Sequence, residues 1–259
     1  MPDTDPVRVA ALADIHAREG NEREIRDLFG QIGTEADVLV LAGDLTGRGQ
    51  AAEAEILADI IRSQRLPVVG VLGNHDYESD QVDQVKTVLC DAGMHLLDDE
   101  PHEIHGVGFA GVKGFYGGFG SHVLAPFGEP LVKRFVHETI DEGLRLESGL
   151  HRLRSAHRVA VLHYAPIRET VVGEPEEIFP FLGSSRLEEP IDRFEATVAV
   201  HGHAHHGAPE GRTAHGVPVY NVAYPLLQTL TPERPYRILT LSAPDVAIKP
   251  ESEQSRRTA

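Results

Sequence analysis

The sequence predicts an α/β fold in which two mixed β-sheets pack as a sandwich flanked by helices. Three observations favour this class. Apolar, β-rich runs alternate with segments of helical period in the first third of the chain, and further apolar runs follow with fewer helices between them. The composition, with 41% hydrophobic residues among 259, is sufficient for a sizeable core. Because continuous apolar strands need cover on both faces, the first sheet is expected to lie between helices and a second sheet.

Three strand and helix units are predicted in the first third of the chain. The runs 7–12, 36–44 and 67–73 are short, apolar and rich in β-formers. Each is followed by apolar side chains at the spacing of one helical face. These stripes are Ile25, Leu28, Phe29 and Ile32; then Ala54, Leu57, Ala58 and Ile61; then Val82, Val85 and Leu89, with Gly93 as a C-terminal cap. The later apolar runs predict a second, more mixed sheet: 106–112, 157–164, 196–203, 217–224 and 236–242.

A single domain is expected over 1–241, with two interruptions. The segment 113–127 is rich in glycine and aromatic residues, which suits a surface loop. The segment 165–190 contains four prolines and little periodicity, so we expect a lid or substrate loop there. The polar segment 242–259 is expected to be a flexible tail. A helix between the two interruptions is predicted from Leu131, Phe135, Val136 and Ile140.

Composition excludes several classes of protein. The formal net charge of -16 argues against a partner as negatively charged as duplex nucleic acid. Cys90 is the only cysteine, which excludes an intramolecular disulfide framework and a thiolate cluster for structural zinc. The first residues lack the basic and apolar regions of a signal peptide, and no apolar run has the roughly 18 to 20 residues that span a bilayer. We therefore expect a cytoplasmic protein without a membrane partner; the oligomeric state stays open.

Polar side chains follow five of the predicted strands at the point where each strand ends. In open α/β sheets the ligand site lies outside the carboxyl ends of the strands, so residues far apart in the chain can converge there. Carboxylate, amide oxygen and imidazole without thiolates favour Mn, Fe, Zn or related ions, and their number suits two metals that share a carboxylate. The residues are Asp14 and His16; Asp44; Asn74, His75 and Asp76; His163; and His201 and His203.

The same residues form an ordered set of motifs. These are DIH (14–16), GD (43–44), GNHD (73–76), an isolated histidine at 163, and GHAH (202–205). In this order and spacing the chain resembles the calcineurin-like metallophosphoesterases, and GDLTGRG followed by GNHD looks most like their small bacterial phosphodiesterases. The resemblance implies a four-layer αββα fold, in which helices cover both sheets.

The resemblance also implies a role for each motif residue. A first metal would be held by Asp14, His16 and His205, and a second by Asn74, His163 and His203, with Asp44 bridging both. His75 would stabilise the transferring phosphoryl group or protonate the leaving oxygen, and Asp76 would orient the ring of His75. His201, directly before Gly202, is expected to be a core residue or a neighbour of a ligand. The metals would be two ions of Mn, Fe, Zn or Ni, whose identity stays open.

The function implied by the resemblance is hydrolysis of a phosphodiester in a small phosphorylated substrate, with nucleotide-like molecules as candidates, by a metal-bridging hydroxide. The alternative is a phosphomonoesterase on the same scaffold, acting on a small molecule or on a protein. Leu72 stands where protein Ser/Thr phosphatases of this superfamily have a phosphate-binding arginine, which weakens the protein-phosphatase interpretation. A non-catalytic interaction module is a third possibility, but such relatives usually lack ligands, and here none is missing.

Overall fold

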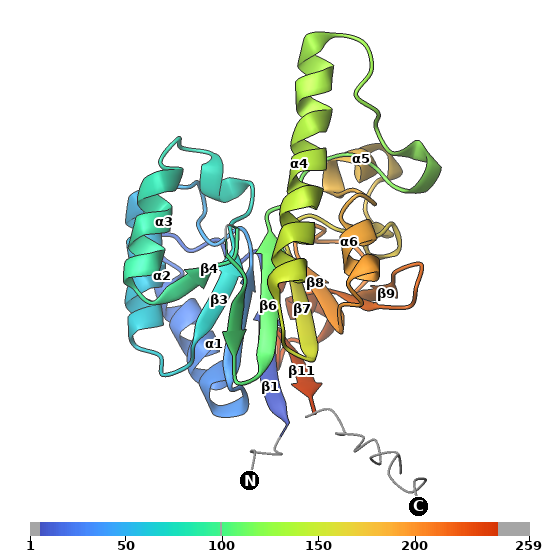
Figure 1. Ribbon diagram of the computed structural model, residues 1–259. Helices are drawn as coiled ribbons and strands as arrows, with labels where there is room; N and C mark the ends of the chain where they lie inside the picture. The colour runs from blue at the N-terminus through green and yellow to red at the C-terminus, as the bar shows by residue number, and fades with distance from the viewer. Residues whose placement is uncertain (1–5, 99, 243–259) are drawn as a thin grey trace, which may run out of the picture.

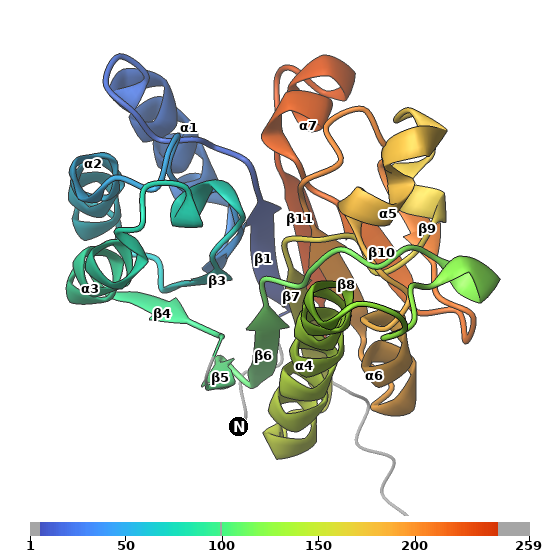
Figure 2. The same cartoon turned by 90° about the horizontal axis from the view of Figure 1, so that it is seen from above.

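The structure, a computed structural model, describes residues 6–98 and 100–242. Two β-sheets pack face to face, and helices cover their outer faces (Figures 1 and 2). The α/β sandwich predicted from the sequence is therefore confirmed. The predicted tail at 242–259 lies outside the described residues, apart from Ser242.

The first sheet contains the three predicted strands that come first in the chain. Strands β1 to β4 pair in parallel, and β11 joins β1 antiparallel at one edge. The parallel pairing follows from the helices between these strands, because a helical crossover returns the chain to the same end of the sheet. In spatial order the strands are β11 (Arg237–Leu241), β1 (Val7–Leu12), β2 (Val38–Ala42), β3 (Val68–Val71) and β4 (Met94–Leu96).

The second sheet is mixed, as the sequence predicted. Its central strands run parallel, and a short antiparallel strand closes each edge. In spatial order the strands are β5 (His102–Ile104), β6 (Val107–Val112), β7 (His157–Leu162), β8 (Val198–His201), β10 (Pro218–Asn221) and β9 (Glu210–Arg212).

The core forms three layers because successive side chains of a strand point to opposite faces of the sheet. In β1, Val9 and Ala11 face the second sheet, whereas Ala10 and Leu12 face the helices on the outside. All four are fully buried. The layer between the sheets consists mainly of valine and alanine, which suits the close spacing of two β-sheets.

Helices cover the outer face of each sheet, and on the first sheet they do so with the apolar stripes that the sequence predicted. On the first sheet lie α1 (Glu22–Glu35), α2 (Ala51–Arg62) and α3 (Val82–Asp91). On the second lie α4 (Pro130–Arg152) and α6 (Glu188–Arg193). The short helices α5 (Phe179–Leu182) and α7 (Tyr224–Leu230) follow β7 and β10.

The two interruptions of the sequence pattern lie at the upper end of the sandwich. Segment 113–129 leads into α4, whose N-terminal half projects beyond both sheets (Figure 1). Segment 165–190 contains short 3-10 helices together with α5 and the start of α6. The start of the segment is joined to residues near its end, because Ala165 N donates to Leu182 O and Ser184 N donates to Ala165 O, both at 3.0 Å. Within the described residues, no helix combines the length and apolarity that would let it cross a bilayer.

Candidate metal centre

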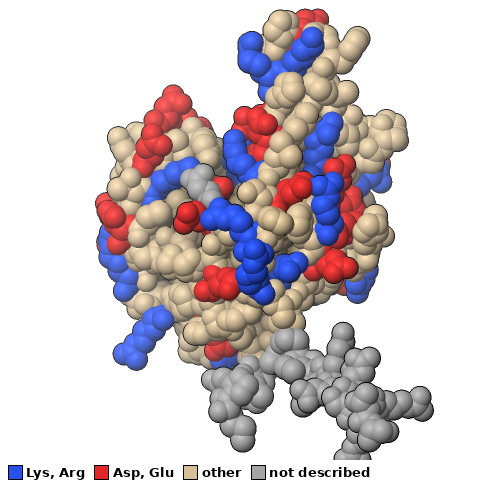
Figure 3. All heavy atoms as spheres, in the orientation of Figure 1, with Lys and Arg blue, Asp and Glu red and all other residues tan. Residues whose placement is uncertain are grey.

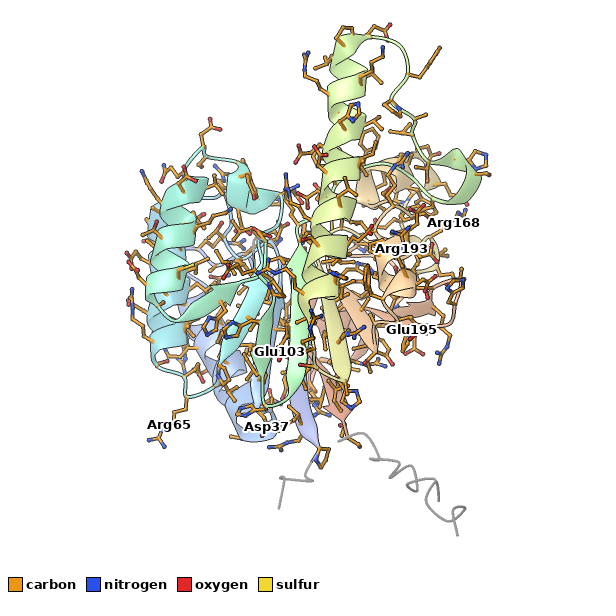
Figure 4. All side chains as sticks on the ribbon, viewed as in Figure 1. Asp37, Arg65, Glu103, Arg168, Arg193 and Glu195 are labelled. Carbon is orange, nitrogen blue, oxygen red and sulfur yellow. The ribbon has the colours of Figure 1, made fainter. Side chains whose placement is uncertain are left out.

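The strands that precede the predicted ligands all end at the same edge of the sandwich. Figure 2 looks down on this edge. Asp37, directly before β2, lies at the opposite, lower end of the molecule (Figure 4), so β2 runs upward and delivers Asp44 to the upper edge. The central strands of both sheets run in the same direction and end at this upper edge. The predicted ligands that follow strands of the first sheet therefore meet those that follow strands of the second.

Two motif glycines are required because the carboxylates of Asp44 and Asp14 pack directly against their backbone. A Cβ atom at Gly73 would collide with Oδ1 of Asp44, and one at Gly202 would collide with Oδ2 of Asp14. Each glycine therefore allows a carboxylate that follows one strand to pack against the backbone of the loop that follows a different strand. This close approach is the physical reason for glycine in GNHD and in GHAH.

Four of the predicted ligands have a left-handed backbone, which is costly for residues other than glycine. The φ angles are 57° at Asp14, 43° at His16, 50° at Asp44 and 67° at His203. Such conformations cost about 1 to 2 kcal/mol each and persist only where the surroundings hold them. Here backbone hydrogen bonds do so: Asp14 N donates to Gly43 O, and His16 N donates to Asp44 O, both at 3.0 Å. Strain of this kind concentrates at functional sites.

The predicted ligands converge in three overlapping groups. Within each group the candidate ligand atoms lie within 4.8 Å of one another, and the groups share His16 and Asp44. The structure thus brings together the carboxylates and imidazoles that were predicted as metal ligands, with His75 among them and Asn74 beside His163. The groups are Asp14, His16 and His205; His16, Asp44 and His75; and Asp44, His163 and His203.

The surroundings of His163 are those of a residue that could ligate a metal ion. Its Nδ1 lies 3.1 Å from the carbonyl oxygen of Ala42, so Nδ1 holds the proton and donates it. Its Nε2 faces Oδ1 of Asn74 at 2.9 Å and Oδ1 of Asp44 at 3.3 Å. Full burial lowers the pKa of His163 well below its ordinary value, so the ring does not take a second proton. Nε2 of His163, Oδ1 of Asn74 and an ionised Asp44 would thus present three lone pairs to one point, which is the chemistry of a metal site.

The two histidines of GHAH are held by different partners. Nε2 of His203 lies 3.1 Å from the carbonyl oxygen of Phe181, which leaves Nδ1 as the ring nitrogen with a free lone pair. Burial lowers the pKa of His203 to about 3, which keeps the ring neutral. Nε2 of His205 lies 3.0 Å from Oδ1 of Asp14, and this hydrogen bond raises the pKa of His205.

Buried negative charge also favours bound cations at this edge. Asp44 is 2% exposed, and its burial, together with the charges of Asp14 and Asp76, raises its pKa to about 9. A carboxylate in this position needs either a proton or a metal ion at neutral pH. The buried imidazoles of His163 and His203 are neutral, so they can ligate a metal but cannot supply the missing charge.

His75 lies at the rim of the cluster. Its side chain is 40% exposed, and its Nε2 lies 3.9 Å from Oδ2 of Asp44. Its Nδ1 is 3.0 Å from the carbonyl oxygen of Gly47, which fixes the orientation of the ring. The ring centroid is 4.7 Å from that of His16. An imidazole in this place can contact a molecule that is bound at the cluster.

The hydrogen bonds of Asp76 differ from those expected. The sequence predicted that Asp76 would orient the ring of His75, but in the structure Gly47 and Glu78 contact Nδ1 of that ring. The carboxylate of Asp76 is fully buried and accepts hydrogen bonds from Leu45 N, Thr46 N, Thr46 Oγ1 and Gly73 N. The reason is that η1 (His75–Tyr77) turns the two adjacent side chains in different directions. Any effect of Asp76 on His75 therefore passes through the backbone.

His201 lies at the end of β8 and is fully buried. Its Nδ1 lies 2.8 Å from the carbonyl oxygen of Gly202, and its Nε2 lies 2.8 Å from Oγ1 of Thr170. Both ring nitrogens thus have partners in the protein. This is the arrangement of a structural histidine.

Several contacts at the site could not be found from the sequence. The carbonyl oxygens of Ala42, Gly47 and Phe181 orient the imidazoles of His163, His75 and His203, but backbone atoms leave no side-chain signal. An aromatic wall beside His203 was also missed. The ring of Tyr164 lies 4.4 Å from that of His203, and the ring of Tyr116 lies 5.3 Å from that of Tyr164. The only signal for this wall was the aromatic content of 113–127.

Solved structures with a similar fold cover most of this chain. Phosphopantetheinyl hydrolase from Mycobacterium tuberculosis is 18% identical, with a TM-score of 0.62 over 91% of this chain and 96% of that one. The protein TT1561 of Thermus thermophilus is 15% identical, with a TM-score of 0.52 over 91% and 99%. GAP50 of Plasmodium, the anchor in the inner membrane complex, is 12% identical, with a TM-score of 0.52 over 85% and 72%. At these identities the likeness shows a shared fold alone.

No curated protein matches the sequence. The family model of the calcineurin-like phosphoesterases matches residues 7–207, which include every motif that carries the predicted ligands. The chain therefore belongs to the calcineurin-like phosphoesterase family of metal-dependent phosphoester hydrolases.

Proposed function

We propose that this protein is a dinuclear metal-dependent phosphodiesterase that acts on a small phosphorylated substrate. The proposal of two metal ions is supported by the position of the Asp44 carboxylate, because its two oxygens face different histidines. Oδ1 lies 3.3 Å from Nε2 of His163, whereas Oδ2 lies 3.8 Å from Nε2 of His16. A carboxylate that faces two groups of ligand atoms can bridge two cations.

The proposed ligands divide between the two sides of Asp44. Asp14, His16 and His205 would hold the first ion, and Asn74, His163 and His203 would hold the second. This division is supported by the hydrogen bond between His205 and Asp14 and by the contact between His163 and Asn74. The donors are oxygen and imidazole nitrogen, which fit Mn, Fe, Zn or Ni.

The chain's own residues would bind the substrate and move a proton. When bound, the cations supply charge that polarises phosphoryl oxygens and lowers the pKa of water. His75 is partly exposed at the rim of the cluster, where its imidazole can donate a proton to the leaving oxygen or stabilise the phosphoryl group. Asp76 would hold the loops that carry Asp44 and His75 in place, through its hydrogen bonds to Thr46 and Gly73.

A diester is favoured over a monoester because of the charge available at the site. A phosphomonoester carries up to two negative charges on its phosphorus oxygens, whereas a diester carries one. Leu72 occupies the place of the phosphate-binding arginine of protein phosphatases, and it is fully buried in the core. This strand end therefore contributes no cation for a second charge on the phosphoryl group.

The proposal is tested with bis-p-nitrophenyl phosphate and metal-free protein to which manganese is added back. We expect hydrolysis by the wild type, and a loss of kcat/KM of about 100-fold or more in His75→Ala and Asp44→Ala. Metal analysis should find two ions per wild-type chain and fewer in Asp44→Ala. His215→Ala, at an exposed position, is the matched control and should keep full activity. Absence of hydrolysis with each of Mn, Fe, Zn and Ni would contradict the proposal.

A phosphomonoesterase is the second candidate, because the same ligands could bind either type of ester. The ratio of kcat/KM for p-nitrophenyl phosphate to that for the diester decides between them. A ratio well below one supports the phosphodiesterase, and a ratio well above one supports the phosphomonoesterase.

A further inference from the structure

A cavity lies beside the proposed metal centre, between α1 and α7. Its volume is about 330 Å³. Asp14 and His16, both proposed ligands of the first ion, are among its lining residues. The other lining residues belong to the loop after β1, to α1 and to α7. A substrate whose phosphorus lies at the first ion can therefore extend one arm into this cavity.

Hydrogen bonds hold the lining of the cavity in place. Tyr224 N donates to Ala13 O at 2.9 Å, which joins the first residue of α7 to the end of β1. Figure 2 shows α1 and α7 on either side of that strand. Asn21 Nδ2 donates to His16 O at 3.1 Å, and Asn21 Oδ1 accepts from Arg18 N at 3.0 Å. The shape of the cavity is therefore set by the same strand end that carries two proposed ligands.

A chain of three polar side chains joins α1 to α7 at this cavity. Tyr224 Oη donates to Glu24 Oε1 at 2.6 Å, and Gln228 Nε2 donates to Tyr224 Oη at 3.3 Å. Burial, together with the hydrogen bond to Glu24, raises the pKa of Tyr224, so the phenol keeps its proton and Glu24 stays the acceptor. In the described part of the chain, Oε2 of Glu24 and Oε1 of Gln228 accept no hydrogen bond. Two acceptors are therefore available to a molecule in the cavity.

The rest of the lining combines apolar surface with balanced charge. Ile25 and Leu28 are buried and supply an apolar part. Glu24 is acidic and Arg18 is basic, while the charge of Asp14 is assigned to the first ion. A neutral arm suits such a lining better than a charged one. The available carboxylate and amide oxygens accept hydrogen bonds, so they select an arm that carries donors.

We propose that this cavity holds one arm of the diester, and that this arm is a neutral group with several hydroxyls, of about the size of one sugar ring. The proposal rests on the proposed function and names the substrate class for the same site. Glu24 and Gln228 would accept hydrogen bonds from the hydroxyls, and the phenol of Tyr224 would keep the Glu24 carboxylate in position. The volume agrees with this size, because ligand sites in proteins begin at about 300 Å³.

A larger cavity, of about 550 Å³, is less suited to this role. It is lined by residues of the segments 119–122, 167–172 and 212–214, together with Ser185 and Glu188. Arg168, one of its lining residues, lies at the outer edge of the molecule (Figure 4). None of the proposed metal ligands lines this second cavity, so nothing connects it to the reacting phosphorus.

The test compares two phosphate monoesters that share the size of their ring and differ in hydroxyl groups. Cyclohexyl phosphate carries a bare ring, and glucose 1-phosphate carries a ring with hydroxyls. Their binding to the manganese-loaded full chain is measured by isothermal titration calorimetry. If either ester is hydrolysed, the ratio of the kcat/KM values replaces the ratio of the dissociation constants.

Three variants change the acceptors, and one serves as a control. Glu24→Ala removes the carboxylate, Glu24→Gln keeps one acceptor oxygen, and Tyr224→Phe removes the phenol that holds Glu24. Asp27→Ala, at a side chain of the same helix that is 74% exposed and does not line the cavity, is the matched control.

We expect the wild type to bind glucose 1-phosphate at least about tenfold more tightly than cyclohexyl phosphate, which corresponds to one good hydrogen bond to a charged acceptor. Glu24→Ala should reduce this ratio to within about threefold of one, Glu24→Gln should restore part of it, and Tyr224→Phe should lower it. Asp27→Ala should leave the ratio unchanged.

Equal affinities in the wild type, no binding of either ester, or the same ratio in the wild type and Glu24→Ala would each overturn the proposal. A wild type that shows the expected ratio but does not hydrolyse bis-p-nitrophenyl phosphate contradicts the proposed function alone. A wild type that hydrolyses this diester but binds the two monoesters equally contradicts the role of the cavity alone.

Discussion

Asp76 shows how one buried carboxylate positions two functional loops. It lies between the loop after β2 and the loop after β3, and its oxygens accept hydrogen bonds from Thr46 N at 2.8 Å and from Gly73 N at 2.8 Å. The first of these loops carries Asp44, and the second carries His75. A shift of Asp76 would therefore move a proposed bridging ligand and a proposed catalytic imidazole together.

Asp76→Asn is expected to lower the free energy of unfolding by about 2 to 4 kcal/mol. All four partners of the carboxylate are donors, so the NH2 group of asparagine would face donors and leave them without an acceptor. Urea unfolding followed by circular dichroism measures the change. Asp91→Asn, at the exposed end of α3, should change the free energy by less than about 0.5 kcal/mol. A similar small effect of both substitutions would refute this role of Asp76.

At the level of single residues, side-chain chemistry could be predicted and orientation could not. Carboxylates and imidazoles after apolar strands indicated the cluster that the structure forms at Asp14, Asp44 and His163. The sequence did not indicate that Gly47, rather than Asp76, would contact the ring of His75. That contact depends on the turn of η1 and on a backbone oxygen, neither of which has a side-chain pattern.

The two halves of helix α4 have different surroundings. Its C-terminal half packs on the second sheet through Leu146 and Leu150, which are fully buried. Its N-terminal half projects beyond the sheets (Figure 1), and Leu131 is 69% exposed there. Arg193 of α6, which Figure 4 shows beside α4, pairs with Glu147 at 2.7 Å and joins the two helices on the outer face.

Two leucines on α4 give a matched test of this division. Leu146→Ala is expected to cost about 2 to 4 kcal/mol of unfolding free energy, because it removes buried contacts and leaves a cavity. Leu144→Ala, at a side chain that is 57% exposed, is expected to change it by less than about 0.5 kcal/mol. Urea unfolding of both variants measures the difference. Equal costs at the two positions would mean that α4 does not pack on the sheet in this way.

At the level of elements, long periodic segments were predictable and short edge strands were not. The helical stripe at Ile25, Leu28, Phe29 and Ile32 is buried as expected, because a whole face of α1 packs on the first sheet. Strands β4, β5 and β9 have three residues each, which is too few for an alternation to be recognised. Leu131 fits a helical stripe, but its exposure depends on how far α4 extends beyond the second sheet, which only the tertiary structure determines.

The proposed metal centre joins the two halves of the whole molecule. Asp14, His16, Asp44 and Asn74 follow strands of the first sheet, and His163, His203 and His205 follow strands of the second. Bound cations would therefore connect the two sheets as well as serve the reaction. The formal net charge is -16, and on the face that Figure 3 shows, acidic and basic side chains are interspersed. Without cations, a buried carboxylate such as Asp44 at the upper edge keeps a proton at neutral pH.

The metal-free protein is therefore expected to lose stability as the pH rises from 7.5 to 9. Burial raises the pKa of Asp44 to about 9 in the folded protein, whereas an unfolded aspartate has a pKa near 4. Between these values the folded chain holds a proton that the unfolded chain has released, so the free energy of unfolding falls as pH increases. The buried histidines with lowered pKa are neutral in both states over this window.

The expected loss is about 1 to 2 kcal/mol, or roughly 3 to 6 °C in the midpoint of thermal unfolding. Differential scanning calorimetry of EDTA-treated protein at the two pH values measures it. Asparagine at position 44 has no proton to lose. The thermal midpoint of Asp44→Asn should therefore fall less between the two pH values than the midpoint of the wild type. The difference between the two falls should be the same few degrees. Equal changes in the two proteins would show that Asp44 is already ionised in the metal-free fold, and that the charge at the centre is balanced without cations.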